Sequence, residues 1–400
     1  LNGDLHRVGL KNNFTGFKAG EKKRVAFRAN FWMLSETDAL PNYIVTAAEL
    51  EARVITSTQV KIDQDSGLEV LPFVTPFSDE LKQFKRTKED STRWLTSKML
   101  YQRNVGNSVE LTEDNLSLAR AIIPTPKLVS YADNNAVVDI SQGIKVHFNG
   151  VAQTEVDAAL DRLARLGLKQ TEVGLPLQLT VAANSRKTIG SYKLSVSQQK
   201  ITIVGVDASG VFNGLQSLAS LYAVGSTNLP LLKVEDEPHY VFRGMLVDVA
   251  RNFHSKEFIL KVLDQMAAYK LNKLHLHLGD DEGWRLEIPS LPELTDISSK
   301  RCFDTSEQSC LISQLGAGVD PNSSVNGYYS VSDYQEILTA ATARHIQVIP
   351  SLDMPGHSRA AMKAMTARYN KYQALEDEEK AKQFLLDDFE DKTPYSSVQF

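Results

Sequence analysis

Three short segments of this 400-residue chain bring together arginine, histidine and carboxylate side chains, which are the types of group that bind and activate polar ligands. An arginine offers a fixed fork of N–H donors to hydroxyls or carboxylates, and a histidine can orient or relay a proton. A carboxylate beside a histidine can fix the tautomer of its ring. Carbohydrate chemistry needs such groups, and the candidates that we take from the three segments are Arg251, Asp280 and His357.

Each of these candidates also has a purely structural interpretation. Arg251 could pair with a structural carboxylate, Asp280 could bind loop amides, and His357 could cap the helix that follows it. Their positions favour a functional role, because each follows a predicted strand and structural charges have no reason to cluster at one rim of a sheet. We therefore predict one shared site.

Several neighbouring side chains suggest a catalytic role that we do not assign. Asp281 and Glu282 look like the acid/base pair of a two-carboxylate glycosidase, but adjacent carboxylates directly after a strand commonly serve the turn. His275 and His277 alternate with leucines and share one face of a strand, where core histidines with satisfied hydrogen bonds are a simpler interpretation than metal ligands. Trp284 could stack on a sugar, but we expect it to pack.

The elements that must position these side chains alternate between strand and helix from residue 238 onward. Compact apolar runs at 245–249 and 274–278, with a third strand at 345–350, predict a buried sheet. Repeated βα units make this sheet parallel, either doubly wound or part of a (β/α)8 barrel, and in both folds functional groups gather where the strands end. The predicted helices begin at Ser255, at Ser332 with a capping box to Gln335, and at Ser358, and the last of them ends at Tyr369.

Two breaks that contain proline divide the chain into three units. They lie at 123–126 and 236–238, where residues before proline favour extended backbone. Residues 122–237 alternate strands with two helical patterns and are predicted to form an α+β domain. Residues 1–121 are β-rich, and an alternating apolar stretch at 23–34 predicts a β-sandwich.

The composition excludes several classes of partner. A net charge of −5 with interspersed signs gives no basic stripe of the kind that collects phosphates, so no nucleic-acid partner is expected. No apolar run approaches the roughly 18 residues that a membrane span needs. Because the first residue is Leu1 rather than methionine, we expect that processing or truncation removed the true start.

The two cysteines, Cys302 and Cys310, stand eight residues apart in a polar segment. A disulfide could close this spacing, whereas no class of zinc site uses such a pair alone. Two reduced, unrelated thiols are the alternative. A disulfide would indicate an exported protein, for which we expect the periplasm or outer membrane, and reduced thiols would indicate a cytosolic one.

The same segments carry a resemblance to a known family. The run FRGMLVDVARNF at 242–253 resembles the opening barrel strand of glycoside hydrolase family 20. KLNKLHLHLGDD at 270–281, followed by GWR, is similar to the second strand of that family, and 349–358, which ends in MPGHS, is similar to its third. The resemblance implies three domains in chain order, which are a partial carbohydrate-binding-type β-sandwich of the bacterial chitobiase kind at 1–121, an α+β domain at 122–237 and the first βα units of a (β/α)8 TIM barrel at 238–400.

The family resemblance implies a β-N-acetylhexosaminidase that releases terminal non-reducing N-acetylhexosamine from chitobiose and chitooligosaccharides. Its catalysis is substrate-assisted and retaining, because the 2-acetamido oxygen of the sugar is the nucleophile while a glutamic acid protonates the leaving oxygen. By motif position, Arg251 would bind hydroxyls of the terminal sugar, and Asp280 and His357 would form a supporting relay toward that acid. No metal, cofactor or obligate protein partner is expected.

One part of the family pattern is not found. The catalytic aspartate–glutamate pair of the family follows a His-x-Gly-Gly segment, and no such segment occurs before Phe400. We therefore expect a truncated barrel that is inactive by itself. The alternatives are a non-catalytic chitin-oligosaccharide-binding protein, a family 18 chitinase whose Asp-x-x-Asp-x-Asp-x-Glu motif is not found here, and a metal-dependent hydrolase that uses His275 and His277.

Overall fold

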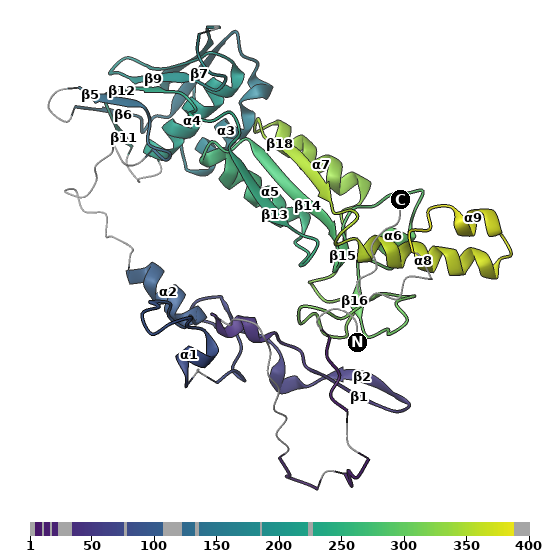
Figure 1. Ribbon diagram of the computed structural model, residues 1–400. Coiled ribbons are helices and arrows are strands. Elements are labelled where there is room, and N and C mark those ends of the chain that lie inside the picture. The colour runs from purple at the N-terminus through teal and green to yellow at the C-terminus, as the bar shows by residue number, and fades with distance from the viewer. Residues whose placement is uncertain are drawn as a thin grey trace.

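The computed structural model describes residues 5–9, 12–16, 18–22, 34–75, 78–106, 122–132, 136–184, 186–222 and 227–387. Figure 1 shows them as three successive units, in the order that the sequence predicts. Within these ranges, no helix combines the length and the apolar character that crossing a membrane requires.

The first unit, within 1–121, contains short antiparallel hairpins. Their strands are only two to five residues long and bury few side chains. The described residues of this unit therefore do not form the predicted β-sandwich, and the alternating stretch at 23–34 lies outside them except for Leu34. The elements are η1 (Glu36–Ala39), β1 (Ile44–Ala47) paired with β2 (Leu50–Val54), η2 (Thr56–Thr58), β3 (Lys61–Ile62) paired with β4 (Glu69–Val70), α1 (Glu80–Gln83) and α2 (Ser97–Gly106).

The second unit is the predicted α+β domain, and its centre is a six-stranded sheet with the order β5-β12-β9-β10-β8-β7. Helix α4 (Ala208–Tyr222) is rich in small and apolar residues and is buried along most of its length, so it packs between the sheet and the third unit. Helix α3 (Asp157–Arg165) lies beside α4 and buries Leu160 and Leu163. The strands are β5 (Leu128–Tyr131), β7 (Ile144–Asn149), β8 (Leu175–Val181), β9 (Tyr192–Val196), β10 (Ile201–Gly205) and β12 (Leu232–Asp236), with β6 (Val137–Asp139) and β11 (Asn228–Pro230) as a separate pair and η5 (Gln153–Glu155) before α3.

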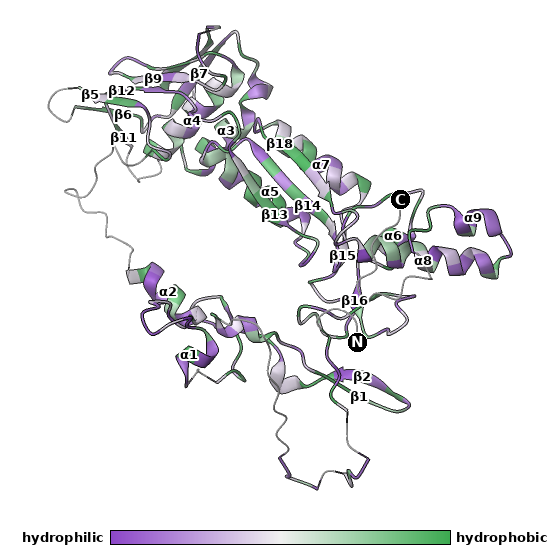
Figure 2. Cartoon of the chain, viewed as in Figure 1, coloured by the Kyte–Doolittle hydropathy of each residue, from purple (hydrophilic) through white to green (hydrophobic). Residues whose placement is uncertain are grey.

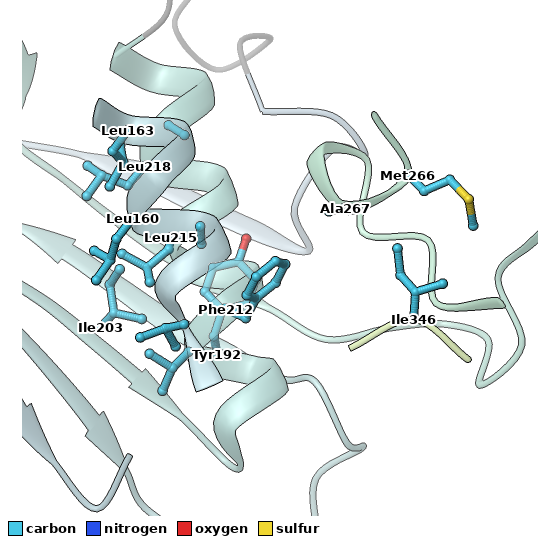
Figure 3. Close-up of a cluster of buried hydrophobic side chains, with 14 of the residues drawn as sticks. Leu160, Leu163, Tyr192, Ile203, Phe212, Leu215, Leu218, Met266, Ala267 and Ile346 are labelled. Carbon is cyan, nitrogen blue, oxygen red and sulfur yellow. The ribbon is translucent and has the colours of Figure 1, made fainter. Parts of the chain in front are cut away.

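The second and third units share one hydrophobic core. Figure 3 shows Phe212 and Leu215 of α4 in the cluster that also includes Met266 and Ile346 of the third unit. At the same boundary, the buried Lys270 ammonium donates to the Tyr192 hydroxyl at 3.0 Å and to Asp236 at 3.2 Å. This packing fixes the end of the third unit that lies opposite the candidate site.

The third unit contains a parallel sheet with β14 (Lys273–Asp280) between β13 (Gly244–Asp248) and β18 (Gln347–Leu352). Its leucines at 274, 276 and 278 are fully buried because they face the helices that cover the sheet. Figure 2 shows the apolar character of α5, in contrast with the hydrophilic α9 near the C-terminal end. Three parallel strands suit both a doubly wound sheet and a barrel, so the (β/α)8 barrel stays a prediction. The helices are α5 (Lys256–Ala268), α7 (Val331–Thr342), α8 (Arg359–Ala374) and α9 (Glu378–Lys382).

Two predicted helix boundaries require correction. The cap of α7 is Ser330, whose hydroxyl accepts from the Asp333 amide at 3.1 Å while Asp333 accepts from the Ser330 amide, so Ser332 and Gln335 do not form the capping box. Helix α8 continues to Ala374, five residues beyond the predicted end at Tyr369. In both cases the apolar pattern identifies the helix but not the residue at which it begins or ends.

An insertion between β14 and α7 contains the two cysteines, and the disulfide Cys302–Cys310 is present, with 5.9 Å between the two Cα atoms. The disulfide prediction is confirmed. Asn42 of the first unit donates its side-chain amide to the carbonyl of Gly316 in this insertion at 2.6 Å. The short elements of the insertion are β15 (Gly283–Trp284), α6 (Glu293–Asp296), β16 (Arg301–Cys302) and β17 (Leu311–Ile312).

Candidate active site

The three predicted site residues meet at one buried carboxylate. Asp280 ends β14, Arg251 follows β13 and His357 follows β18, so the carboxyl ends of three neighbouring strands deliver them to one edge. Nη2 of Arg251 lies 2.8 Å from Oδ2 of Asp280, and Nδ1 of His357 hydrogen-bonds Oδ1 of Asp280 at 3.2 Å. The side chain of Asp280 has no exposed surface. The structure therefore brings together all three residues that the sequence selects.

Asp280 is held as an anion. Burial opposes its ionisation, but hydrogen bonds from the His277 ring and the Asp281 amide, together with the charges of Arg251 and His357, outweigh burial and lower its pKa. Nε2 of His277 lies 2.9 Å from Oδ2, and the Asp281 amide donates to Oδ1 at 2.7 Å. A charged acceptor at this position can orient every donor that faces it.

The Arg251 guanidinium is surrounded by three carboxylates. It donates to Asp248 at 2.5 Å and pairs with Asp280, while Oε2 of Glu282 lies 3.7 Å from its Nε atom. Asp248 also accepts from the amides of Ala250 and Arg251, which shapes the turn after β13. About two-fifths of the Arg251 side chain remains exposed. The arginine is thus fixed on one side and open on the other.

The adjacent carboxylates Asp281 and Glu282 differ in environment. Asp281 accepts from the Arg359 amide at 3.0 Å, so it has a structural role, although at the start of α8 rather than in the turn after β14 that the sequence predicts. Glu282 does not fit that role, because its Oε2 atom is buried and has no hydrogen-bond partner. Burial, reinforced by the negative charge of Asp280, raises the pKa of Glu282 to about 7. One member of the pair is therefore structural and the other is a proton-holding group beside Arg251.

The buried Arg285 holds in place the segment that follows β13. Its side chain is fully buried, and it donates to the backbone carbonyls of Val249, Ala250, Ser299 and Gly327 at 2.8 to 3.2 Å. These four carbonyls belong to the segment that carries Arg251 and to two separate parts of the insertion. Arg285 therefore positions the site without facing it.

His275 and His277 hydrogen-bond to other side chains of the protein. His275 Nε2 and His277 Nδ1 lie 2.7 and 2.8 Å from the Ser351 hydroxyl, and His277 Nε2 contacts Asp280. His277 and Asp280 also lie near Asp353, with candidate ligand atoms within 4.8 Å of one another. The histidines thus match the interpretation as satisfied core residues, and they extend the hydrogen bonds of the site into the sheet.

Three known family models match successive segments of the chain. Residues 240–394 match the catalytic domain of glycosyl hydrolase family 20, and residues 119–237 match domain 2 of the same family. Residues 1–98 match a putative carbohydrate binding domain. The chain belongs to glycosyl hydrolase family 20. The resemblance seen in the sequence is therefore confirmed.

Two named relatives of this family 20 chain come from species of Vibrio. A β-hexosaminidase of Vibrio vulnificus is 44% identical over 100% of this chain and 46% of its own length. An N,N'-diacetylchitobiase of Vibrio harveyi is 39% identical over 100% of this chain and 44% of its own length. The chain thus spans about half the length of these relatives.

A solved structure agrees with the family assignment. The family 20 exo-β-N-acetylglucosaminidase of Vibrio harveyi, in complex with N-acetylglucosamine, aligns with a TM-score of 0.57 and 28% identity over 70% of this chain and 41% of that chain. Within this family 20 chain, sequence reasoning missed Asp248 and Ser351 as partners of the site. Asp248 interrupts an otherwise apolar strand, which is a signal that could have identified it. Trp284 is buried among Leu294, Leu311 and residues of α8, so its predicted packing role is confirmed.

Proposed function

We propose that the protein to which this chain belongs is a β-N-acetylhexosaminidase of the chitobiase type. The observation that carries the proposal is the contact of both Arg251 and His357 with the buried carboxylate of Asp280, at the strand ends of a family 20 catalytic domain. Its substrates would be chitobiose and related oligosaccharides, from which it releases terminal N-acetylhexosamine. The names of the relatives, β-hexosaminidase and N,N'-diacetylchitobiase, support this substrate class.

The proposed mechanism is substrate-assisted. The carbonyl oxygen of the 2-acetamido group attacks the anomeric carbon while the bond to the leaving oxygen breaks, which gives an oxazolinium-like intermediate. A glutamic acid, which the family pattern places outside residues 1–400, protonates the leaving oxygen. Water then attacks the anomeric carbon, the bond to the acetamido oxygen breaks, and the glutamate recovers a proton. Two inversions at one carbon retain its configuration.

The described residues would support this chemistry by position and charge. Arg251 has one side fixed by carboxylates, so its exposed N–H groups are oriented to donate to hydroxyls of the terminal sugar. Asp280 accepts from Nδ1 of His357, which leaves Nε2 of that ring for the acid glutamate. The His357 side chain is more than half exposed and can reach a partner above the strand ends.

The test of the proposed function uses the full-length protein that contains this chain. We expect release of a chromophore from an N-acetylglucosaminide, and no release from the matching glucoside, because the glucoside lacks the acetamido nucleophile. Arg251→Ala should lower kcat/KM on the order of a hundredfold or more, since several charge-assisted hydrogen bonds to the sugar are lost. Arg165→Ala, at a surface pair with Asp264, is the control and should leave kcat/KM unchanged. A folded but inactive wild-type protein would refute the proposal.

We also propose that the protein is exported, to the periplasm or outer membrane. The disulfide Cys302–Cys310 supports this location, because disulfides persist in oxidising compartments. Cell fractionation of the native host, followed by immunodetection, tests it. Recovery of the protein from the cytosol with both thiols free would contradict it.

A further inference from the structure

A continuous chain of hydrogen bonds runs from the candidate site into the interior of the sheet. It links His275, Ser351, His277, Asp280 and His357, and each of the four links measures 2.7 to 3.2 Å. The strand pairing makes the chain possible, because β14 and β18 align His277 with Ser351 in parallel register.

The direction of every hydrogen bond follows from the charge of Asp280. An ionised carboxylate only accepts, so Nε2 of His277 and Nδ1 of His357 both carry the protons that they donate to it. A neutral His277 then has a lone pair on Nδ1, which accepts from the Ser351 hydroxyl. That hydroxyl has one hydrogen, so it accepts in turn from Nε2 of His275. One arrangement of protons satisfies all five groups.

We propose that His277 and Ser351 are positioning residues for the relay that Asp280 and His357 form. His277 holds Oδ2 of Asp280, so that Oδ1 stays aligned with His357, and Ser351 keeps His277 in the tautomer that can donate. His275 completes the chain by supplying the donor that the Ser351 oxygen needs. This inference rests on the proposed function, because it assigns a role within the same site.

Packing alone does not account for this arrangement. A polar cluster inside a sheet can often be replaced by apolar residues of similar volume at little cost in stability, so stability gives no reason for three polar side chains here. The chain ends on the carboxylate that contacts both Arg251 and His357. The titratable groups that face this carboxylate or lie close to it come from three strand ends. They are His277 of β14, Arg251 after β13, Asp281 and Glu282 after β14, and Asp353 and His357 after β18.

The experiment measures kcat, KM and the pH profile of the full-length protein with two changes at one position. Ser351→Ala removes the hydroxyl, so the relay loses one hydrogen bond. We expect kcat to fall about tenfold and KM to stay within about twofold. The acidic limb of the pH profile of kcat should move. Ser351→Thr keeps a hydroxyl on a strand residue and should restore most of kcat and the original profile. Ser220→Ala on α4, which also removes a hydroxyl that donates to a protein group, controls for the substitution itself.

A second readout does not depend on turnover. In protein labelled with 15N-histidine, the His277 signals should report a protonated Nε2 and an unprotonated Nδ1, and Ser351→Ala should mix the tautomers. An inactive wild-type protein refutes the proposed function. An active wild type whose Ser351→Ala variant keeps its kcat and pH profile refutes only the positioning role. If Ser351→Ala fails to fold, an Nδ1–H tautomer of His277 in the wild type still overturns the inference.

Discussion

Oε2 of Glu282 lies 3.7 Å from Nε of Arg251, so a buried carboxylate oxygen without a hydrogen bond faces a guanidinium that two other carboxylates already neutralise. The arginine does not offset the burial of Glu282 and the charge of Asp280, which is why the pKa of Glu282 rises to about 7. The site therefore contains a group that changes charge near neutral pH.

The first prediction is that Glu282→Gln makes the protein more stable at alkaline pH. Between the usual pKa of 4.5 and the folded pKa of about 7, the folded state keeps a proton that the unfolded state releases, so stability falls as pH rises through this window. The full difference, on the order of 3 kcal/mol, is lost above it. Urea unfolding at pH 5 and pH 8 should show that the variant gains at pH 8 relative to pH 5. Glu379→Gln, exposed on α9, should show no such difference.

The second prediction concerns Asp280→Asn. Burial opposes the charge of Asp280, but the donors around it lower its pKa, so it stabilises the fold above its usual 3.8 and this contribution is lost as pH falls through the lower folded value. The amide can no longer accept on both sides, so the variant should lose stability at pH 7 and lose kcat on the order of a hundredfold. Thermal unfolding and steady-state kinetics measure both effects. A variant with full kcat would mean that the relay does not serve the reaction.

The third prediction concerns Arg285→Lys. The ammonium of lysine has three donors without the planar fork, so it cannot serve all four carbonyls that the guanidinium binds. Buried carbonyls without donors cost about 1 to 3 kcal/mol each, so the free energy of unfolding should fall on the order of 3 kcal/mol. Amide exchange should accelerate at 249–254 before it does in the second unit. Equal protection of these amides in both proteins would contradict the role of Arg285.

The fourth prediction concerns the disulfide. Closing a loop of about nine residues lowers the entropy of the unfolded chain, which raises its free energy by roughly 2.5 kcal/mol. The double variant Cys302→Ser, Cys310→Ser should therefore destabilise the third unit by about that amount. The enclosed loop contains Glu307, which pairs with Arg359 directly after the segment of His357. We therefore expect a lower kcat as well, and chemical reduction of the wild type should lower kcat to the same extent. Unchanged kcat in both proteins would show that the disulfide-bonded loop does not affect the site.

The sequence predicts the strands and helices of the second and third units because their apolar patterns are long and their interiors are buried. For the first unit, the described residues do not form the predicted β-sandwich, and their strands are short and largely exposed and therefore leave little pattern. Helix ends were also misplaced, because the Ser330 cap depends on one local hydrogen bond rather than on the apolar period. Site residues at strand ends were found because parallel strands carry their chemistry at one edge.

Apart from Asp248, the partners of the site residues could not be found from the sequence. Ser351 lies 74 residues from His277, and nothing in either segment indicates that the two strands align at these positions. Glu282 stands next to Asp281 and has the same charge. Its Oε2 atom is buried without a hydrogen bond, whereas Asp281 accepts from a helix amide. Such differences arise from neighbours that only the folded sheet brings close.

The hydroxyl of Ser351 has a consequence for folding as well as for the site. If β18 slipped by one residue against β14, Pro350 or Leu352 would face the histidines. His275 would then lose its acceptor and the buried His277 its donor. Each such loss costs about 1 to 3 kcal/mol, so the misaligned sheet would be strongly disfavoured. The polar side chains thus specify one register between the two strands, and this register is the one that assembles the relay.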